Sequence, residues 1–116
     1  SRFDVMAKND SETCFVEVKN VTLKEGSYAL FPDAVTSRGK KHLETLAKVK
    51  EKGMRAVMLY IIQRTDVEIF APAEDIDPEY AESLKKVYQK GVEIIPIQAK
   101  VTPEKIELIK ELPFEL

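Results

Sequence analysis

The stretch Cys14-Phe15-Val16-Glu17-Val18-Lys19 alternates apolar and polar residues, which is typical of a β-strand with one buried face. A similar alternation covers residues 1–5, and the turn-forming residues Asn9-Asp10-Ser11-Glu12 lie between the two stretches. A turn centred in this segment places Asp4 directly opposite Glu17, with the apolar side chains paired on the other face. These residues are therefore predicted to form an antiparallel hairpin.

The polar face of this hairpin has the charges of a metal site. Directly opposed like charges are destabilising, so Asp4 and Glu17 need a positive partner between them. Lys19 lies on the same face as Glu17 and can neutralise part of the charge, whereas a divalent cation bridging the two carboxylates would neutralise more. The carbonyl of Val18 is a further oxygen ligand for such an ion. The other interpretation is a charged cross-strand ladder on a solvated face.

Length and charge limit the classes of protein that this chain can represent. With 116 residues and a hydrophobic fraction of 44%, it can form one compact domain. The formal charge of -2 excludes a uniformly basic nucleic-acid-binding protein but not a local basic patch. Six Lys or Arg residues lie between positions 38 and 52, whereas positions 66–82 hold seven acidic residues and no basic one. The sequence predicts one positive and one negative surface, unless both runs are ordinary solvated helix faces.

The cysteine content and the apolar runs indicate the compartment. Cys14 is the only cysteine and lies on the apolar side of its strand, as expected for a core residue in a reducing compartment. The longest apolar run, Ala56 to Ile62, is far shorter than a membrane span, and we find no signal-peptide pattern. We expect a cytoplasmic protein with no membrane partner.

Helical and extended patterns alternate after the hairpin. The run 56–62 has no polar interruption, as expected of a strand covered on both faces. Pro96 lacks an amide donor and favours the edge of a sheet or a bulge. The predicted elements are a loop over 29–33, a helix over 37–52 capped by Thr36 or Ser37, the strand 56–62, a helix from Pro78 capped by Asp77, a strand over 92–98 and a short helix over 103–109. This order predicts an α/β fold with a mixed central sheet flanked by helices.

Two further groups of residues could bind phosphate. The first is at the predicted helix N-terminus, which attracts phosphate oxygens, and includes Asp33, Thr36, Arg38 and Lys41. In the same segment His42, the only histidine, has no partner identifiable from the sequence and is expected to face solvent or to pack. Asp33 could equally be a turn or cap residue.

The second group is Gln63-Arg64 at the end of the buried strand, where α/β sheets usually place functional loop residues. The alternative is that Arg64 forms a structural salt bridge with Asp66 or Glu68. The chain has no Gly-rich phosphate loop and no Cys or His spacing for zinc.

The E-x-K spacing of Glu17 and Lys19, together with Asp4, matches the needs of a PD-(D/E)xK nuclease. Such an enzyme uses carboxylates to hold Mg²⁺, because the metal lowers the pKa of bound water and stabilises charge on the phosphate. It also needs a cation near the attacking water, and Lys19 can supply it.

Several segments together resemble the sugar fermentation stimulation protein A family. The similar segments, in the family's order, are Ser1-Arg2-Phe3-Asp4, Phe15 to Leu23, Phe31-Pro32-Asp33-Ala34-Val35-Thr36-Ser37-Arg38-Gly39, Gln63 to Val67, Phe70-Ala71-Pro72 and Ile76 to Tyr80. The resemblance implies a prokaryotic protein with an OB-like N-terminal barrel and a PD-(D/E)xK, restriction-endonuclease-like C-terminal domain. It also implies non-specific DNA binding and a role in regulating sugar metabolism, including that of maltose. We expect residues 1–116 to be a single nuclease-like domain that lacks the barrel.

The resemblance assigns roles by position. Asp4, Glu17 and Lys19 would be the catalytic set, and Mg²⁺ or Mn²⁺ would bind Asp4, Glu17, the Val18 carbonyl and Asp33. The expected DNA contacts are Arg2, Thr36, Arg38, Lys41, Gln63 and Arg64. Double-stranded DNA, the protein's own OB-like domain and, as a further option, a second copy are the expected partners. An active Mg²⁺-dependent endonuclease and a protein-interaction domain without DNA binding are the alternative functions.

Overall fold

The computed structural model describes the backbone of residues 5–8 and the whole of residues 13–116. The predicted hairpin is present, because β1 (Val5–Lys8) pairs antiparallel with β2 (Thr13–Val21). Val5 lies opposite Val16, which confirms the register expected from the sequence. Arg2 and Asp4 lie outside the described residues, so their predicted roles stay predictions.

The main sheet is mixed, as predicted. Its strand order is β1-β2-β5-β7-β8, and β5 (Arg55–Ile62) lies at its centre. β2, β5 and β7 (Glu93–Val101) are parallel, whereas β1 and β8 (Ile106–Glu111) pair antiparallel at the two edges. The uninterrupted apolar run is therefore a central strand, but its two faces differ. Ala56, Met58, Tyr60 and Ile62 are fully buried on one face, whereas Leu59 and Ile61 on the other face are only partly buried.

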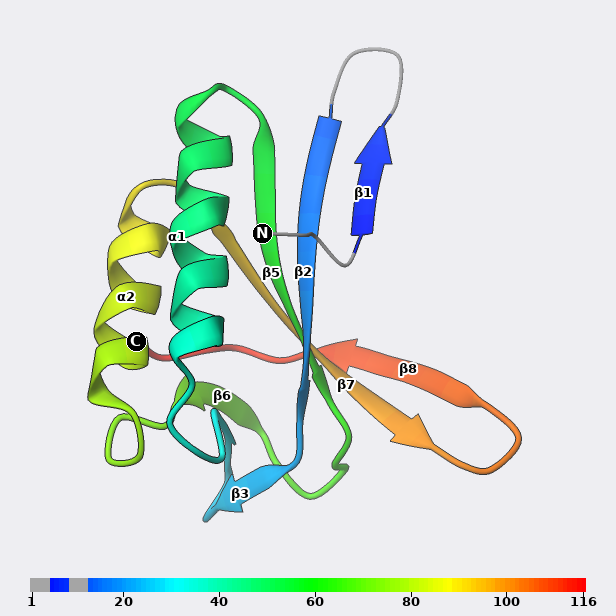
Figure 1. Cartoon of the computed structure of the whole chain (residues 1–116). Coiled ribbons are helices and arrows are strands. Elements are labelled where there is room, and N and C mark those ends of the chain that lie inside the picture. Colours follow the sequence, from blue (N-terminus) through cyan, green and yellow to red (C-terminus); the bar gives the residue numbers. More distant parts are fainter. Residues whose placement is uncertain (1–4, 9–12) are drawn as a thin grey trace.

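Both helices lie on one face of the main sheet (Figure 1). α1 (Ser37–Glu51) precedes β5, and α2 (Pro78–Gln89) precedes β7. Since β2, β5 and β7 succeed one another in a single direction across the sheet, crossovers of the same hand place both helices on the same side. Neither of the two helices in the described part of the chain is long and apolar enough to cross a membrane.

The core lies between these helices and β5. Leu43 and Leu46 of α1, Leu84 of α2, and Met58 and Tyr60 of β5 are all fully buried. Each buried aliphatic side chain of this size stabilises the fold by about 1.5–3 kcal/mol relative to exposure. The core therefore holds α1 firmly against the sheet face that also carries Glu17.

A second, smaller sheet contains β3 (Leu23–Glu25), β4 (Tyr28–Phe31) and β6 (Ile69–Pro72). The prediction of a loop over 29–33 is wrong for its first residues. Gly26, with a φ of 61°, allows a tight turn between β3 and β4, and β6 then pairs parallel with β4. Pairing between distant segments therefore overrides a local composition that resembles a loop.

The C-terminal segment also differs from the prediction. Residues 106–109 belong to β8 and not to a helix, because Thr102 Oγ1 accepts a hydrogen bond from the Lys105 amide and closes a β-hairpin turn. Pro96 is buried within β7 and not at a sheet edge. The Pro96 carbonyl accepts a hydrogen bond from the Leu112 amide, just beyond the last β7–β8 pair. The nitrogen of Pro96 lies where the β7–β8 ladder has ended, so no ladder hydrogen bond is lost there.

Candidate metal centre

Glu17 is a buried carboxylate beneath α1. Glu17 and Lys19 share the face of β2 that is turned toward the helices, as their E-x-K spacing predicts. The Glu17 side chain is 2% exposed and that of Lys19 is 19% exposed. Burial of an ionised carboxylate is costly unless other groups compensate its charge. A solvated cross-strand ladder is therefore the wrong description of Glu17.

The compensating groups are Lys19 and His42 of α1. His42 Nδ1 lies 2.6 Å from Glu17 Oε1, and Lys19 Nζ lies 3.1 Å from the same His42 nitrogen. Lys19 Nζ is 3.6 Å from Glu17 Oε1. Thus a carboxylate, an imidazole and an ammonium converge between β2 and α1.

The carboxylate remains incompletely satisfied in this cluster. Among the described residues, Glu17 Oε1 is the buried side-chain oxygen without a hydrogen-bond partner, because the short contact with His42 lacks hydrogen-bonding geometry. An ammonium has no lone pair, so His42 Nδ1 must accept in its contact with Lys19. Glu17 Oε1 is thus left without a donor, and a cation near this oxygen would compensate its charge. The cluster therefore fits a divalent cation.

The described residues supply only part of a ligand set. Within residues 13–116, no three His, Cys, Asp or Glu side chains form a metal-binding group. Asp33 is exposed in the segment between β4 and α1 and does not join Glu17 in such a group. Glu17 is the one predicted side-chain ligand that the structure places in the cluster, and the predicted contribution of Asp4 stays outside the described part.

A buried polar network fixes the helices above this cluster. Asp77 Oδ1 accepts from the Tyr80 amide at 3.0 Å and caps α2, while Asp77 Oδ2 accepts from the Thr36 amide at 2.9 Å. Thr36 in turn caps α1, since its Oγ1 accepts from the Gly39 amide at 3.0 Å. One carboxylate thus joins the N-termini of both helices.

Two tyrosines lie beneath the helices. The hydroxyl groups of Tyr60 and Tyr80 are 2.6 Å apart, and both rings are fully buried. Burial raises the pKa of Tyr80, and the negative charges of Asp77 and Glu17 raise it further, whereas the hydrogen bond with Tyr60 lowers it. Both phenols are therefore neutral, and the Glu17 carboxylate is close enough to Tyr80 for its charge to raise the pKa of that phenol.

The predicted DNA-contact residues on α1 have different environments. The Thr36 side chain is used as a helix cap, whereas Arg38 and Lys41 are exposed. Arg38 lies one turn before His42, so about 6 Å along the helix separates it from the cluster. A hollow of about 280 Å³ at this helix end is lined by Thr36, Lys40 and Lys41, and also by acidic residues.

Arg64 forms the structural salt bridge that was the alternative prediction. Its guanidinium donates to both carboxylate oxygens of Asp66, at 2.9 and 2.7 Å, and to the Thr22 carbonyl at 3.3 Å. Ile62 pairs with Val21, so Gln63 and Arg64 lie beyond the carboxyl end of β2. Arg64 is level with position 23, six residues past Glu17, which is roughly 20 Å along a strand. The structure therefore does not bring Arg64 together with Glu17.

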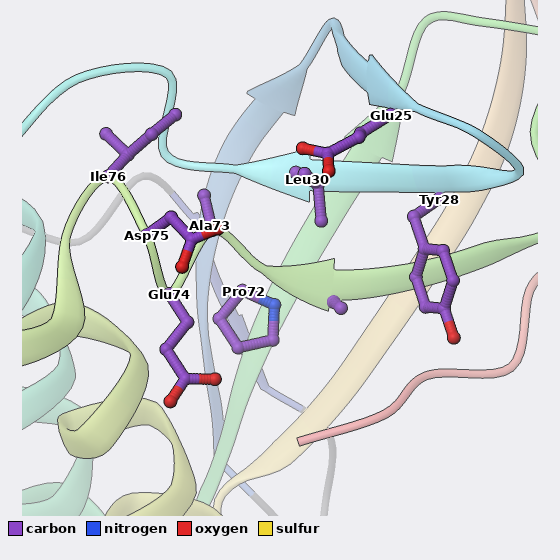
Figure 2. Close-up of a pocket in the computed structure, with 9 residues that line it drawn as sticks. Glu25, Tyr28, Leu30, Pro72, Ala73, Glu74, Asp75 and Ile76 are labelled. Atoms are coloured by element: carbon purple, nitrogen blue, oxygen red, sulfur yellow. The ribbon is translucent and has the colours of Figure 1, made fainter.

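A separate pocket lies over the small sheet (Figure 2). It has a volume of about 270 Å³, and its lining includes the carboxylates of Glu25, Glu74 and Asp75. No Lys or Arg and none of the predicted site residues line it. Its charge makes it unsuitable for a phosphate group.

His42 is a member of this cluster to which the sequence pattern assigned no functional role. It occupies the same buried stripe of α1 as Leu43 and Leu46, and it is 7% exposed. A polar residue at a core-facing helical position requires a polar partner, so the helical periodicity could have identified it. The identity of that partner depends on how α1 packs on β2.

A family model, curated relatives and a solved structure all match this chain and all belong to one family. The family model described as "Sugar fermentation stimulation protein RE domain" matches residues 1–105. Curated sugar fermentation stimulation protein homologues from Geobacter metallireducens and Pelobacter propionicus are each 49% identical over 97% of this chain, which covers 49% of their length. A homologue from Shewanella loihica is 44% identical over the whole chain, which covers 50% of it. The chain thus spans about half the length of the curated relatives it matches.

A solved structure of Pyrococcus furiosus SfsA in complex with Ca²⁺ is similar over 100% of this chain and 51% of its own, with a TM-score of 0.93 and 34% identity. The extent of the family match and the identity to the curated homologues show that this chain belongs to the sugar fermentation stimulation protein family.

Proposed function

We propose that this chain is a DNA-binding domain with a nuclease-like divalent-metal site at Glu17. The observation that supports this most is the buried Glu17 oxygen without a hydrogen-bond partner, next to Lys19 and His42. A buried carboxylate oxygen in this state is unusual in a structural core, where buried polar atoms normally have hydrogen-bond partners. The Ca²⁺ complex of the Pyrococcus furiosus relative adds support, because Ca²⁺ and Mg²⁺ both take oxygen ligands.

In this proposal the ion is held by the Glu17 carboxylate and the Val18 carbonyl, together with Asp4. When bound, such a cation neutralises phosphate charge and activates water. Lys19 is the most exposed of the three clustered side chains, so DNA would approach from its side. Arg38 and Lys41 would bind neighbouring phosphates along α1, near its positively polarised N-terminus. Regulation of sugar metabolism in the cytoplasm would then operate through DNA binding.

Cleavage is the second candidate function, and the position of Lys19 favours it. The Lys19 ammonium lies 3.6 Å from the Glu17 oxygen, as required of a group that assists a water or a phosphate oxygen beside the metal ligand. A domain that only binds DNA needs cations at its surface, but it does not need a buried carboxylate beside one of them.

The test is incubation of the chain with plasmid DNA in Mg²⁺, Mn²⁺ or EDTA, read for nicking and for gel retardation. Glu17→Gln removes the charged ligand, and Glu51→Gln removes the same charge from an exposed site at the far end of α1. We expect gel retardation with every variant and under every metal condition, and this retardation should weaken as the salt concentration rises. We also expect metal-dependent nicking, which Glu17→Gln should abolish and Glu51→Gln should not. If EDTA does not affect retardation and no nicking occurs, the proposal of DNA binding stands and the proposal of cleavage is refuted. Absence of retardation would favour the protein-interaction alternative.

A further inference from the structure

His42 places Lys19 in an unusual position relative to Glu17. A lysine ammonium and a carboxylate that pair directly approach to about 2.7–2.9 Å. The Lys19 Nζ to Glu17 Oε1 distance is 3.6 Å, although both groups lie on one face of one strand. The ammonium is bonded instead to His42 Nδ1, at 3.1 Å.

The imidazole itself is firmly positioned. His42 belongs to the buried stripe of α1, and Leu43 and Leu46 in that stripe are fully buried. The start of α1 is held by the Thr36 cap and by Asp77, which accepts from the Thr36 amide. The packing of α1 therefore holds the ring in its position 2.6 Å from Glu17 Oε1.

We propose that His42 is a positioning residue that keeps Glu17 available to a divalent cation by holding the Lys19 ammonium away from it. This inference rests on the metal site proposed above. Without the imidazole acceptor, Lys19 would close on Glu17 and form an ordinary buried ion pair. The ammonium would then occupy the carboxylate oxygen that the structure leaves without a hydrogen bond.

The experiment measures ion binding to the metal-free chain, with Ca²⁺ by calorimetry and with Mn²⁺ by electron paramagnetic resonance. We expect His42→Leu to weaken binding by about 10–100-fold, as is typical when a group that orients a metal ligand is lost. His42→Asn, whose side-chain oxygen can replace Nδ1 as the acceptor, should retain most of the affinity. Lys19→Met should bind at least as tightly as the wild type, because no ammonium then competes for Glu17.

The decisive comparison is the double variant His42→Leu/Lys19→Met. If His42 acts by restraining Lys19, the loss seen in His42→Leu should disappear in this background. An equal loss in both backgrounds would show that His42 only supports the fold, and would overturn the inference. Weaker binding by Lys19→Met alone would overturn it too, and this single variant provides the test if His42→Leu does not fold.

Two outcomes separate this inference from the function on which it rests. If the wild-type chain binds Ca²⁺ and Mn²⁺ no better than Glu17→Gln does, the metal site itself is refuted, and the role of His42 with it. If binding requires Glu17 but is the same in His42→Leu, the metal site stands and only the role of His42 is refuted.

Discussion

Asp77→Ala should destabilise the fold and weaken the proposed metal site together, although Asp77 is not one of the proposed ligands. Asp77 is 4% exposed, and its two carboxylate oxygens accept hydrogen bonds from the Tyr80 and Thr36 amides. Loss of a helix N-cap costs about 0.5–2 kcal/mol. A second amide left without its partner costs about 1–3 kcal/mol, at the low end here because the Thr36 contact is only partly buried.

The free energy of unfolding should therefore fall by about 1.5–3 kcal/mol. For a domain of this size, roughly 4 °C of Tm corresponds to each kcal/mol, so Tm should fall by about 6–12 °C. Urea unfolding in EDTA measures the first quantity, and calorimetric titration with Ca²⁺ measures the effect on the ion site. Because Asp77 secures the end of α1 nearest to His42, we expect weaker ion binding as well.

Asp75→Ala is the matched control, because Asp75 is exposed in the same segment and has the same charge. Its effect should remain within about 0.5 kcal/mol, as for most surface substitutions. Equal stability of Asp77→Ala and Asp75→Ala would refute the view that one carboxylate joins the two helix N-termini. If Asp77→Ala shows the expected decrease in the free energy of unfolding but binds Ca²⁺ as the wild type does, the proposed metal site does not depend on the position of α1.

Three further predictions concern single residues. Gly39→Ala should destabilise the chain by about 1–3 kcal/mol in urea unfolding, despite the better helix propensity of alanine, because its Cβ would lie 2.8 Å from Thr36 Cγ2; a more stable variant would contradict this. Arg38→Ala should weaken DNA binding and reduce the slope of log K against log salt by about 0.9, the value for one lost phosphate contact, and an unchanged slope would remove Arg38 from the interface. A hydrogen bond from Arg64 holds the pKa of Asp66 below its usual range. The stabilisation from that pair is present above about pH 4 and is lost as pH falls through the lowered pKa, so the stability difference between wild type and Asp66→Asn should be constant near neutrality and narrow in acid. Acid unfolding curves that keep a constant separation would contradict this.

The features that could be predicted from the sequence are those set by neighbouring residues. The register of the first hairpin follows from strand alternation and turn composition, and Val5 does lie opposite Val16. The caps at Thr36 and Asp77 need only an acceptor side chain three residues before an amide, and both were predicted. The central position of β5 follows from its uninterrupted apolar run.

The errors fall where distant segments pair. Residues 106–109 fit a helical pattern locally, yet they belong to β8, which pairs with β7. All residues of β8 are exposed, so its sequence lacks the alternation of apolar and polar residues that identifies a half-buried strand. Pro96 was expected at a sheet edge or a bulge, but it lies in an interior strand, because β8 ends where the missing amide would have been needed. In both cases the deciding contact is made by residues remote in sequence.

The same division applies to the candidate site. The sequence by itself determined that Glu17 and Lys19 share one face of a strand, since alternation along a strand is a local property of the backbone. Only the tertiary structure decided that Glu17 on this face is buried and that His42 contacts both the ammonium and the carboxylate. It also decided that Arg64 pairs with Asp66 and lies far from Glu17. The physical reason is that burial and charge pairing depend on how α1 packs on β2, and this packing is set by the whole core.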